Sequence, residues 1–205
     1  MILLKNLTIG YDEPISENIN FRFDKQTYAI LGESGCGKST LLRTICGLHK
    51  PLSGSVFIDD EEVVGVHKDV YMMHQHYTNY DWLSCLDNII LAAKVKQTIS
   101  ANTKSDALDA LEAVGLRDKA NKHPYELSGG QKQRLALART LFIKPKYILM
   151  DEPLSALDPV TRKSMQELIT KYQYETKSTI LMITHSEDEA AKVGNKIIRL
   201  QKGMF

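Results

Sequence analysis

The chain has 205 residues, 43% hydrophobic and 25% charged, which is ordinary for a globular protein and fits one large domain or one core with an insertion. Lys and Arg number 26 against 25 Asp and Glu, so the formal charge is only +1. This balance argues against nucleic acid as a partner and against direct adsorption to an anionic membrane surface, because both usually require a basic excess.

Three other features concern location. Cys36, Cys46 and Cys85 are an odd number at irregular spacing, which indicates reduced cytosolic thiols rather than disulfides. Residues 1–12 lack a cationic start followed by a long apolar run, so no secretory signal is expected. No stretch approaches about 18 uncharged apolar residues, so any work at a membrane requires another chain to cross it.

The first 60 residues predict short strands with polar breaks and one helix. The helix runs from Ser39 to Leu48, and Gly47 and Pro51 lie near its end. The strands are expected at Ile2–Ile9, Ile19–Phe23, Thr27–Leu31 and Ser55–Ile58.

The middle of the chain is helical in pattern, and the last third alternates. Helices are expected over Leu86–Val95, around Ala107–Val114 and from Ser128 to Leu141. Further strands are expected at Tyr147–Met150, Thr179–Thr184 and Ile197–Leu200, with helices at Val160–Tyr174 and Glu187–Val193. Strands that alternate with helices imply a mostly parallel sheet covered on both faces.

A phosphate-binding loop follows the strand Thr27–Leu31. The pattern G-x-x-x-x-G-K-[ST] is complete, and glycines let successive backbone N–H groups point at phosphate oxygens before a helix N-terminus. Lys38 would reach the β- and γ-phosphates, and the Ser39 hydroxyl would be placed for Mg²⁺. The nucleotide-binding residues predicted here are Gly32, Glu33, Ser34, Gly35, Cys36, Gly37, Lys38, Ser39 and Thr40.

Two carboxylates end the apolar run at residues 147–150. Ligands of open α/β sheets bind beyond the carboxyl ends of the strands, which is where Asp151 and Glu152 lie. Asp151 would hold Mg²⁺, directly or through water. Glu152 would accept a proton from the water that attacks the γ-phosphate.

The stretch Leu127-Ser128-Gly129-Gly130-Gln131 resembles the signature of the ABC ATPase family. From the residues alone, Ser128 is a helix N-cap, and the two glycines leave backbone N–H groups open for a second anion. A single γ-phosphate does not need two such sites on one chain. The resemblance implies that residues Ser128, Gly129, Gly130 and Gln131 close over the nucleotide of a second subunit.

The resemblance implies further roles. Gln75 matches the Q-loop glutamine that contacts Mg²⁺ and the attacking water, His185 matches the histidine that contacts the γ-phosphate, and Tyr11 matches the aromatic residue that stacks on adenine. The Mg²⁺ ligands would be Ser39, Gln75 and Asp151. A loop that touches the opposing subunit, the D-loop, would comprise Ser155, Ala156, Leu157 and Asp158.

The predicted fold is a RecA-like P-loop NTPase core with an N-terminal antiparallel β segment and an inserted helical subdomain. The core would comprise residues 1–75 and 140–205, and the subdomain residues 76–139. The resemblance implies an ATPase that uses ATP and Mg²⁺, dimerises head to tail, most simply as a homodimer, and powers a transmembrane permease. It would lie at the cytoplasmic face of the membrane, with an extracytoplasmic solute-binding protein in the complex.

Other classes of protein fit these motifs less well. A soluble ABC ATPase of DNA repair would carry a long coiled coil between Lys38 and Ser128, where no sustained heptads occur, and a ribosome-associated one would usually have two cassettes. A small-molecule P-loop kinase would not explain the signature or His185. A degraded, non-hydrolysing subunit would not keep Glu152 and His185. A metal site at His74 and His76 lacks further ligands at suitable spacing.

Residues 81–89 resemble the segment after the Q-loop in importers of nitrate, sulfonates and taurine, which favours an importer. Trp82, Leu83 and Leu86 form an apolar group, part of which is expected to be exposed and to accept a short helix of the membrane subunit. The chain stops soon after its last predicted strand, so no regulatory domain is expected there. Cys36, close to Lys38 and a helix N-terminus, is expected to be reactive.

Overall fold

The protein is described from a computed structural model, in which residues 1–75 and 79–201 are placed. These residues form β1 (Ile2–Gly10), β2 (Pro14–Phe23), β3 (Thr27–Leu31), α1 (Lys38–Ile45), β4 (Ser53–Ile58), β5 (Glu61–Glu62), β6 (Val70–Met73), α2 (Cys85–Val95), α3 (Thr103–Ala113), two 3₁₀ turns (Arg117–Lys119 and Pro124–Glu126), α4 (Gly129–Phe142), β7 (Tyr147–Asp151), α5 (Pro159–Thr176), β8 (Thr179–Ile183), α6 (Glu187–Val193) and β9 (Lys196–Arg199).

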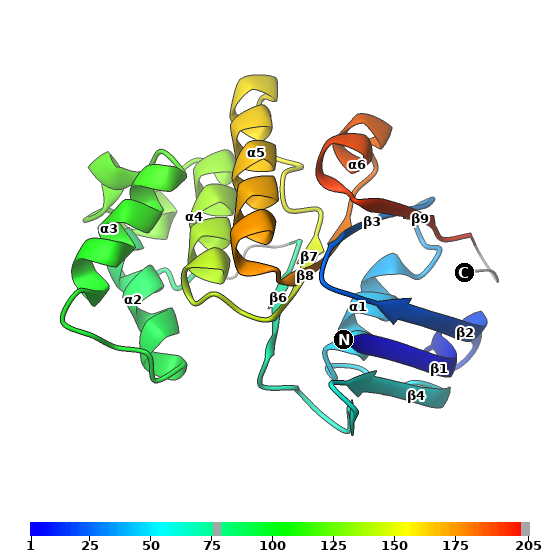
Figure 1. Ribbon diagram of the computed structural model, residues 1–205. Helices are drawn as coiled ribbons and strands as arrows, with labels where there is room; N and C mark the ends of the chain where they lie inside the picture. Colours follow the sequence, from blue (N-terminus) through cyan, green and yellow to red (C-terminus); the bar gives the residue numbers. More distant parts are fainter. Residues whose placement is uncertain (76–78, 202–205) are drawn as a thin grey trace.

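The central sheet is parallel, with strand order β6-β7-β8-β3-β9 (Figure 1). Every residue of β3, β7 and β8 is buried, which explains why these strands read as nearly unbroken apolar runs. Parallel strands end at the same edge of their sheet. This edge therefore brings together the segments that follow β3, β7 and β8, which contain the phosphate loop, Glu152 and His185.

A second, antiparallel sheet has the order β2-β1-β4-β5. Its strand β1 buries Ile2, Leu4, Leu7 and Ile9, so the alternation of buried positions skips one residue. The skip coincides with a register shift against β2 and with Asn6, whose φ is 46°. This bulge keeps all four apolar side chains on the core face of the strand.

Two apolar cores lie on opposite faces of the central sheet. Ile148 and Met150 of β7 belong to a core that also contains side chains of α2, α3, α4 and α5. Tyr147 and Leu149, which alternate with them, belong to a second core with α1 and the antiparallel sheet. The strand is thus covered on both faces, as the sequence predicted.

The predicted elements are confirmed in type, and the differences lie at their ends. Helix α1 stops at Ile45 rather than Leu48, because the amide of Leu48 turns back to the carbonyl of Arg43 at 2.9 Å. Strand β2 begins earlier than expected, at Pro14, and β5 was not expected because two exposed glutamates carry no apolar pattern. No helix in the described ranges is long and apolar enough to cross a membrane.

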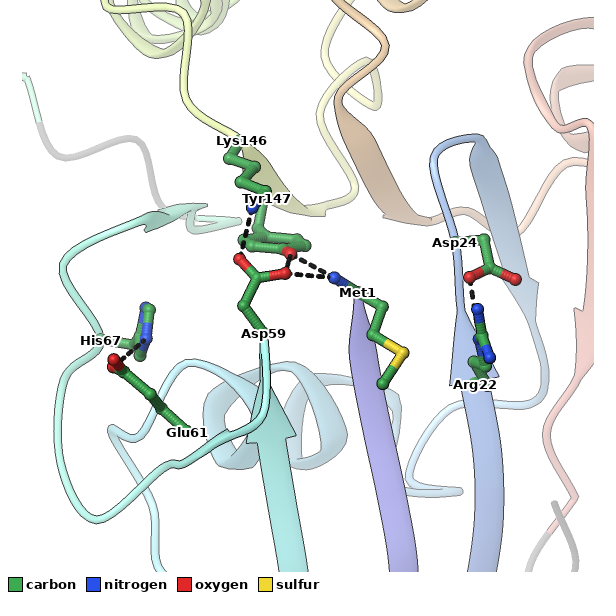
Figure 2. A network of polar contacts seen from close by, with 8 residues as sticks. All are labelled: Met1, Arg22, Asp24, Asp59, Glu61, His67, Lys146 and Tyr147. Carbon is green, nitrogen blue, oxygen red and sulfur yellow. Dashed lines mark hydrogen bonds and ion pairs between the residues drawn. The ribbon is translucent and has the colours of Figure 1, made fainter.

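A polar network joins the two sheets at the start of β1 (Figure 2). The carboxylate of Asp59 accepts hydrogen bonds from the α-amino group of Met1, the ammonium of Lys146 and the hydroxyl of Tyr147. Partial burial opposes ionisation of Asp59, but these three donors outweigh it and hold the pKa of Asp59 well below its usual range. Burial and the bond to Asp59 raise the pKa of Tyr147. Sequence patterning gave no sign of this network.

The depressed pKa of Asp59 predicts a pH-dependent contribution to stability. The contribution is fully present above the unfolded-state pKa of about 4 and is lost as pH falls through the lower folded-state pKa. The difference in unfolding free energy between the wild type and Asp59→Asn should therefore be constant from neutral pH to about pH 5 and shrink below about pH 4.

Urea denaturation at several pH values measures this difference. Asp24→Asn is the control, because Asp24 forms an exposed pair with Arg22 at 2.9 Å and should change stability little at any pH. A stability difference for Asp59→Asn that does not vary with pH would contradict the assignment.

Candidate active site

The loop between β3 and α1 wraps around the side chain of Lys38. Gly37 immediately precedes the helix and adopts a φ of 100°, and a Cβ on it would lie 2.8 Å from a methyl carbon of Ile15. The Lys38 ammonium donates to the carbonyls of Gly32 and Glu33, both at 2.7 Å. Lys38 is only 6% exposed, so water screens its positive charge little, and an anionic ligand in the loop would be attracted to it.

Glu152 lies directly beyond β7, and its carboxylate contacts two residues predicted to share its site. The Nε2 atom of His185 lies 2.5 Å from Oε1 of Glu152, and the amide of Gln75 donates to Oε2 at 3.2 Å. Asp151, the last residue of β7, is 4% exposed. Three segments far apart in sequence thus converge on one carboxylate.

A cleft of about 460 Å³ connects this carboxylate with the loop. It is lined by Tyr11, Ile15, Ser34, Gly35, Gly37, Lys38, Ser39, Thr40, Gln75, Glu152 and His185. Tyr11 is 54% exposed, and its ring lies 4.7 Å from the ring of His49. An exposed aromatic face on the lining of such a cleft can stack on a flat ligand such as a nucleobase.

The signature residues do not line this cleft. Ser128 caps α4: its hydroxyl accepts from the amide of Gln131 at 3.3 Å, and the Gln131 side chain accepts from the amide of Ser128 at 2.9 Å. Ser128 and Gly129 are exposed. A Cβ on Gly130 would lie 3.0 Å from the carbonyl oxygen of Ala156, so the start of α4 packs closely on the predicted D-loop of its own chain.

The predicted D-loop, residues 155–158, also has a local structural task. Asp158 caps α5 by accepting from the amides of Val160 and Thr161, at 3.1 and 3.0 Å. Hydrogen bonding with Thr161 holds the pKa of Asp158 below its usual range. One contact beside it was not expected from the sequence: Gln133 of α4 bonds to the backbone of both Glu152 and Ala156.

The predicted magnesium ligands supply hard oxygen donors from three elements. Ser39 offers a hydroxyl at the start of α1, Gln75 an amide oxygen after β6, and Asp151 a buried carboxylate. This set fits Mg²⁺, which keeps several waters and takes one or two protein carboxylates plus phosphate oxygens. No cluster of three His, Cys, Asp or Glu side chains suited to a metal occurs in the described part of the chain.

Three predictions near the site have different outcomes. Burial and the charge of Arg43 lower the pKa of His74, and its partner in the rejected metal site, His76, lies outside the described residues.

Trp82 is 74% exposed as expected, whereas Leu86 is only 8% exposed because it packs into the core of the helical region. The burial of Cys36 argues against the expectation that its thiol is reactive.

The side chain of Cys36 points back into the protein. It is 3% exposed, and its sulfur would lie 2.8 Å from a Cβ placed on Gly32. The sulfur lies 3.9 Å from the ammonium of Lys38, so the charge that was expected to activate the thiol is near, but solvent access is lacking.

A parallel sheet that presents a glycine-rich loop, a buried lysine and strand-end carboxylates at one edge defines a P-loop nucleotide-binding protein. The model of the ABC transporter family matches residues 16–155. The chain belongs to this family, as the signature predicted.

The relatives agree with this assignment. The aliphatic sulfonates import ATP-binding protein SsuB 3 of Pseudomonas savastanoi pv. phaseolicola is 43% identical over 88% of this chain and 64% of its own length. The aliphatic sulfonates import ATP-binding protein SsuB of Zymomonas mobilis subsp. mobilis is 46% identical over 88% of this chain and 72% of its own. The resemblance to sulfonate-type importer ATPases is therefore confirmed. The chain spans a little under two thirds of the length of the Pseudomonas relative.

A solved structure resembles the whole chain. The ATP-binding cassette MJ0796, in a dimeric post-hydrolysis state bound to ADP and Pi, superposes with a TM-score of 0.88 at 31% identity, covering 100% of this chain and 96% of that one. The predicted fold class, a P-loop core with an antiparallel β segment and an inserted helical region, is thereby confirmed.

The burial of Cys36 predicts slow alkylation. In the folded protein a maleimide should label Cys36 far more slowly than it labels the same thiol in guanidinium chloride, because the thiolate must be exposed to react. Mass spectrometry of peptides after timed labelling measures each cysteine separately. Cys46 and Cys85, which are also buried, are internal references. Rapid labelling of Cys36 that ATP prevents would contradict this geometry.

Proposed function

We propose that the chain binds ATP with Mg²⁺ and hydrolyses it to ADP and phosphate. The observation that carries this proposal is the Glu152 carboxylate, held by His185 at 2.5 Å and Gln75 at 3.2 Å on the lining of the cleft that contains Lys38. A carboxylate beside a phosphate-binding loop can accept a proton from an attacking water. Because His185 and Gln75 both contact this carboxylate, its orientation toward the attacking water would be the same in every catalytic cycle.

The residues of the cleft divide the chemistry among them. Backbone N–H groups of the loop and the Lys38 ammonium would bind the phosphates, and Tyr11 would stack on adenine. Ser39, Gln75 and Asp151 would hold Mg²⁺, which supplies charge neutralisation at the phosphates when bound. Glu152 would take the water proton, and His185 would contact the γ-phosphate.

The site is proposed to be completed by a second subunit. Ser128, Gly129, Gly130 and Gln131 lie outside the cleft of their own chain, and the first two are exposed with an open helix N-terminus. Backbone N–H groups of that kind bind anions. In a head-to-tail homodimer each signature would close over the nucleotide of the other chain, and residues 155–158 would lie between the two sites.

The proposed cellular role is import, with a transmembrane permease and an extracytoplasmic solute-binding protein as partners, at the cytoplasmic face of the membrane. The two sulfonate import relatives support a small organic anion such as a sulfonate as cargo. Neither name supports the alternative function, a soluble ABC ATPase that acts on DNA or ribosomes. Residues 1–75 and 140–205 would be the nucleotide-binding core, and 76–139 a helical subdomain whose first three residues lie outside the described chain.

Trp82 is the residue best placed to contact the permease. Its ring lies 5.3 Å from the ring of Tyr80, at a tilt of 53°. The guanidinium of Arg139 lies 4.9 Å from the centre of the Tyr80 ring. The buried amide of Asn88 fixes Tyr80 by bonding to its N–H and carbonyl at 2.9 and 3.0 Å. A rigid, exposed aromatic residue is a typical anchor of protein interfaces.

Hydrolysis is tested with Glu152→Gln. Removing the carboxylate leaves the phosphate loop intact, so ATP should still bind, while turnover should fall by roughly 10²- to 10⁴-fold. Phosphate release and nucleotide binding by filter assay measure the two properties, and size exclusion should detect an ATP-bound dimer. Asp24→Asn is the control, because Asp24 is not among the residues that line the cleft. Unchanged turnover would remove Glu152 from its role.

Docking is tested with Trp82→Ser. Loss of the exposed ring should abolish co-purification with the permease of the same transporter while basal ATPase activity survives, because Trp82 is not part of the cleft lining. Tyr174→Ser removes an equally exposed aromatic ring elsewhere, at 72% exposure, and should not affect co-purification. Equal loss in both variants, or none in Trp82→Ser, would argue against this surface.

A further inference from the structure

Gln133 is a fully buried polar residue inside the helical region, and both ends of its amide are bonded to backbone. It lies on α4 two residues after the signature and is 1% exposed. Its Nε2 donates to the carbonyl oxygen of Glu152 at 3.0 Å, and its Oε1 accepts from the amide of Ala156 at 2.9 Å. The amide therefore clamps the chain on both sides of the turn that follows β7.

The clamped residue has an unusual backbone. Glu152 adopts a φ of 50°, in the left-handed region that residues other than glycine occupy at a cost. Such a conformation persists only where surrounding contacts over-determine it. The amide of Glu152 donates to the carbonyl of Ile183 at 3.2 Å, and its carbonyl accepts from Gln133 and from the Ser155 hydroxyl at 3.1 Å. Gln133 is the one of these partners that comes from the helical region.

The direction of the Glu152 side chain follows from this backbone. A change of φ at Glu152 would redirect the bond from its Cα to its Cβ, and with it the carboxylate that contacts His185 and Gln75. The Glu152 carbonyl also accepts from the hydroxyl and the amide of Ser155 within the turn, so these two contacts would remain without Gln133. Loss of Gln133 would thus relax the peptide orientation without necessarily unfolding the turn.

We propose that Gln133 is a positioning residue for hydrolysis, which holds the backbone of Glu152 so that its carboxylate faces the attacking water. This inference rests on the proposed function, because it requires Glu152 to be the base. Gln133 also connects two sites. Helix α4 begins at the signature, which is proposed to contact the partner's nucleotide, and its second turn carries Gln133, which bonds to Glu152 of the same chain. A displacement of α4 at one nucleotide would be transmitted to the base at the other.

The test replaces Gln133 by methionine, which is similar in length but makes no hydrogen bonds of this kind. Turnover by Gln133→Met should fall at least about tenfold in kcat, since misplacement of a catalytic group by about 1 Å costs about 10²-fold, while the KM for ATP stays within about threefold. Gln166→Met is the matched control: Gln166 is 6% exposed and bonds to Glu189 at 3.5 Å, and its loss should leave kcat unchanged.

A double-mutant cycle separates positioning from a general structural role. If Gln133 acts through the Glu152 carboxylate, adding Gln133→Met to Glu152→Gln should cause less than about a twofold further loss in single-turnover hydrolysis. A structural defect would lower both backgrounds equally. Gln133→Glu is the second variant; it retains an acceptor for Ala156 but has no donor for Glu152, and should lower kcat as Gln133→Met does.

Each outcome decides between the proposals. Wild-type kcat in Gln133→Met, a rise in KM alone, or equal losses in the two backgrounds would overturn the positioning role while leaving the ATPase assignment intact. A failure of both Gln133 variants to fold, with Gln166→Met folded, would also overturn it in favour of a structural role. A folded wild type without ATPase activity would instead refute the proposed function, and the inference with it.

Discussion

The parallel pairing of β7, β8 and β3 is the constraint on which the site depends. Each of these strands is buried on both faces, so none can shift its register without moving apolar side chains out of the apolar clusters that cover it, which for β3 include a small third cluster of Ala29 and Leu31 with Ala190 of α6. Their common direction brings three distant loops to one edge. The positions of Lys38, Glu152 and His185 relative to one another are therefore set by the sheet before any side chain in the site contributes.

Helix α4 is attached to the segment that follows β7 at this edge of the sheet. Its N-cap Ser128 and the following Gly129 are exposed, whereas the next turn inserts a buried amide, Gln133, against the end of β7. Gly130 allows this insertion, because a side chain there would meet the carbonyl of Ala156. Within the six residues 128–133, the helix therefore has an exposed N-terminus and a turn that is bonded to the loop after β7.

Most of the fold and the set of candidate site residues followed from local pattern. The phosphate loop, the Ser128 cap and the buried strands each have a short signal with a direct physical cause, and these are the features that the structure reproduces. The direction of the Cys36 side chain was missed because it depends on how the loop packs against Gly32, which spacing does not encode. Gln133 and Asp59 were missed for a related reason: each is defined by a partner distant in sequence, and a lone polar residue gives no hint of that partner.

The position of β3 has a consequence for how the chain reaches this structure. β3 is complete by residue 31, yet its two neighbours in the sheet are β8 and β9, which are the last strands of the described chain. During synthesis β3 therefore emerges with both of its edges unpaired and stays so until about 150 further residues have been added. Such late, long-range pairing slows folding and prolongs the exposure of an aggregation-prone strand. The β1–β2 hairpin and α1, which pack against the same core and are synthesised early, are the segments available to shield it.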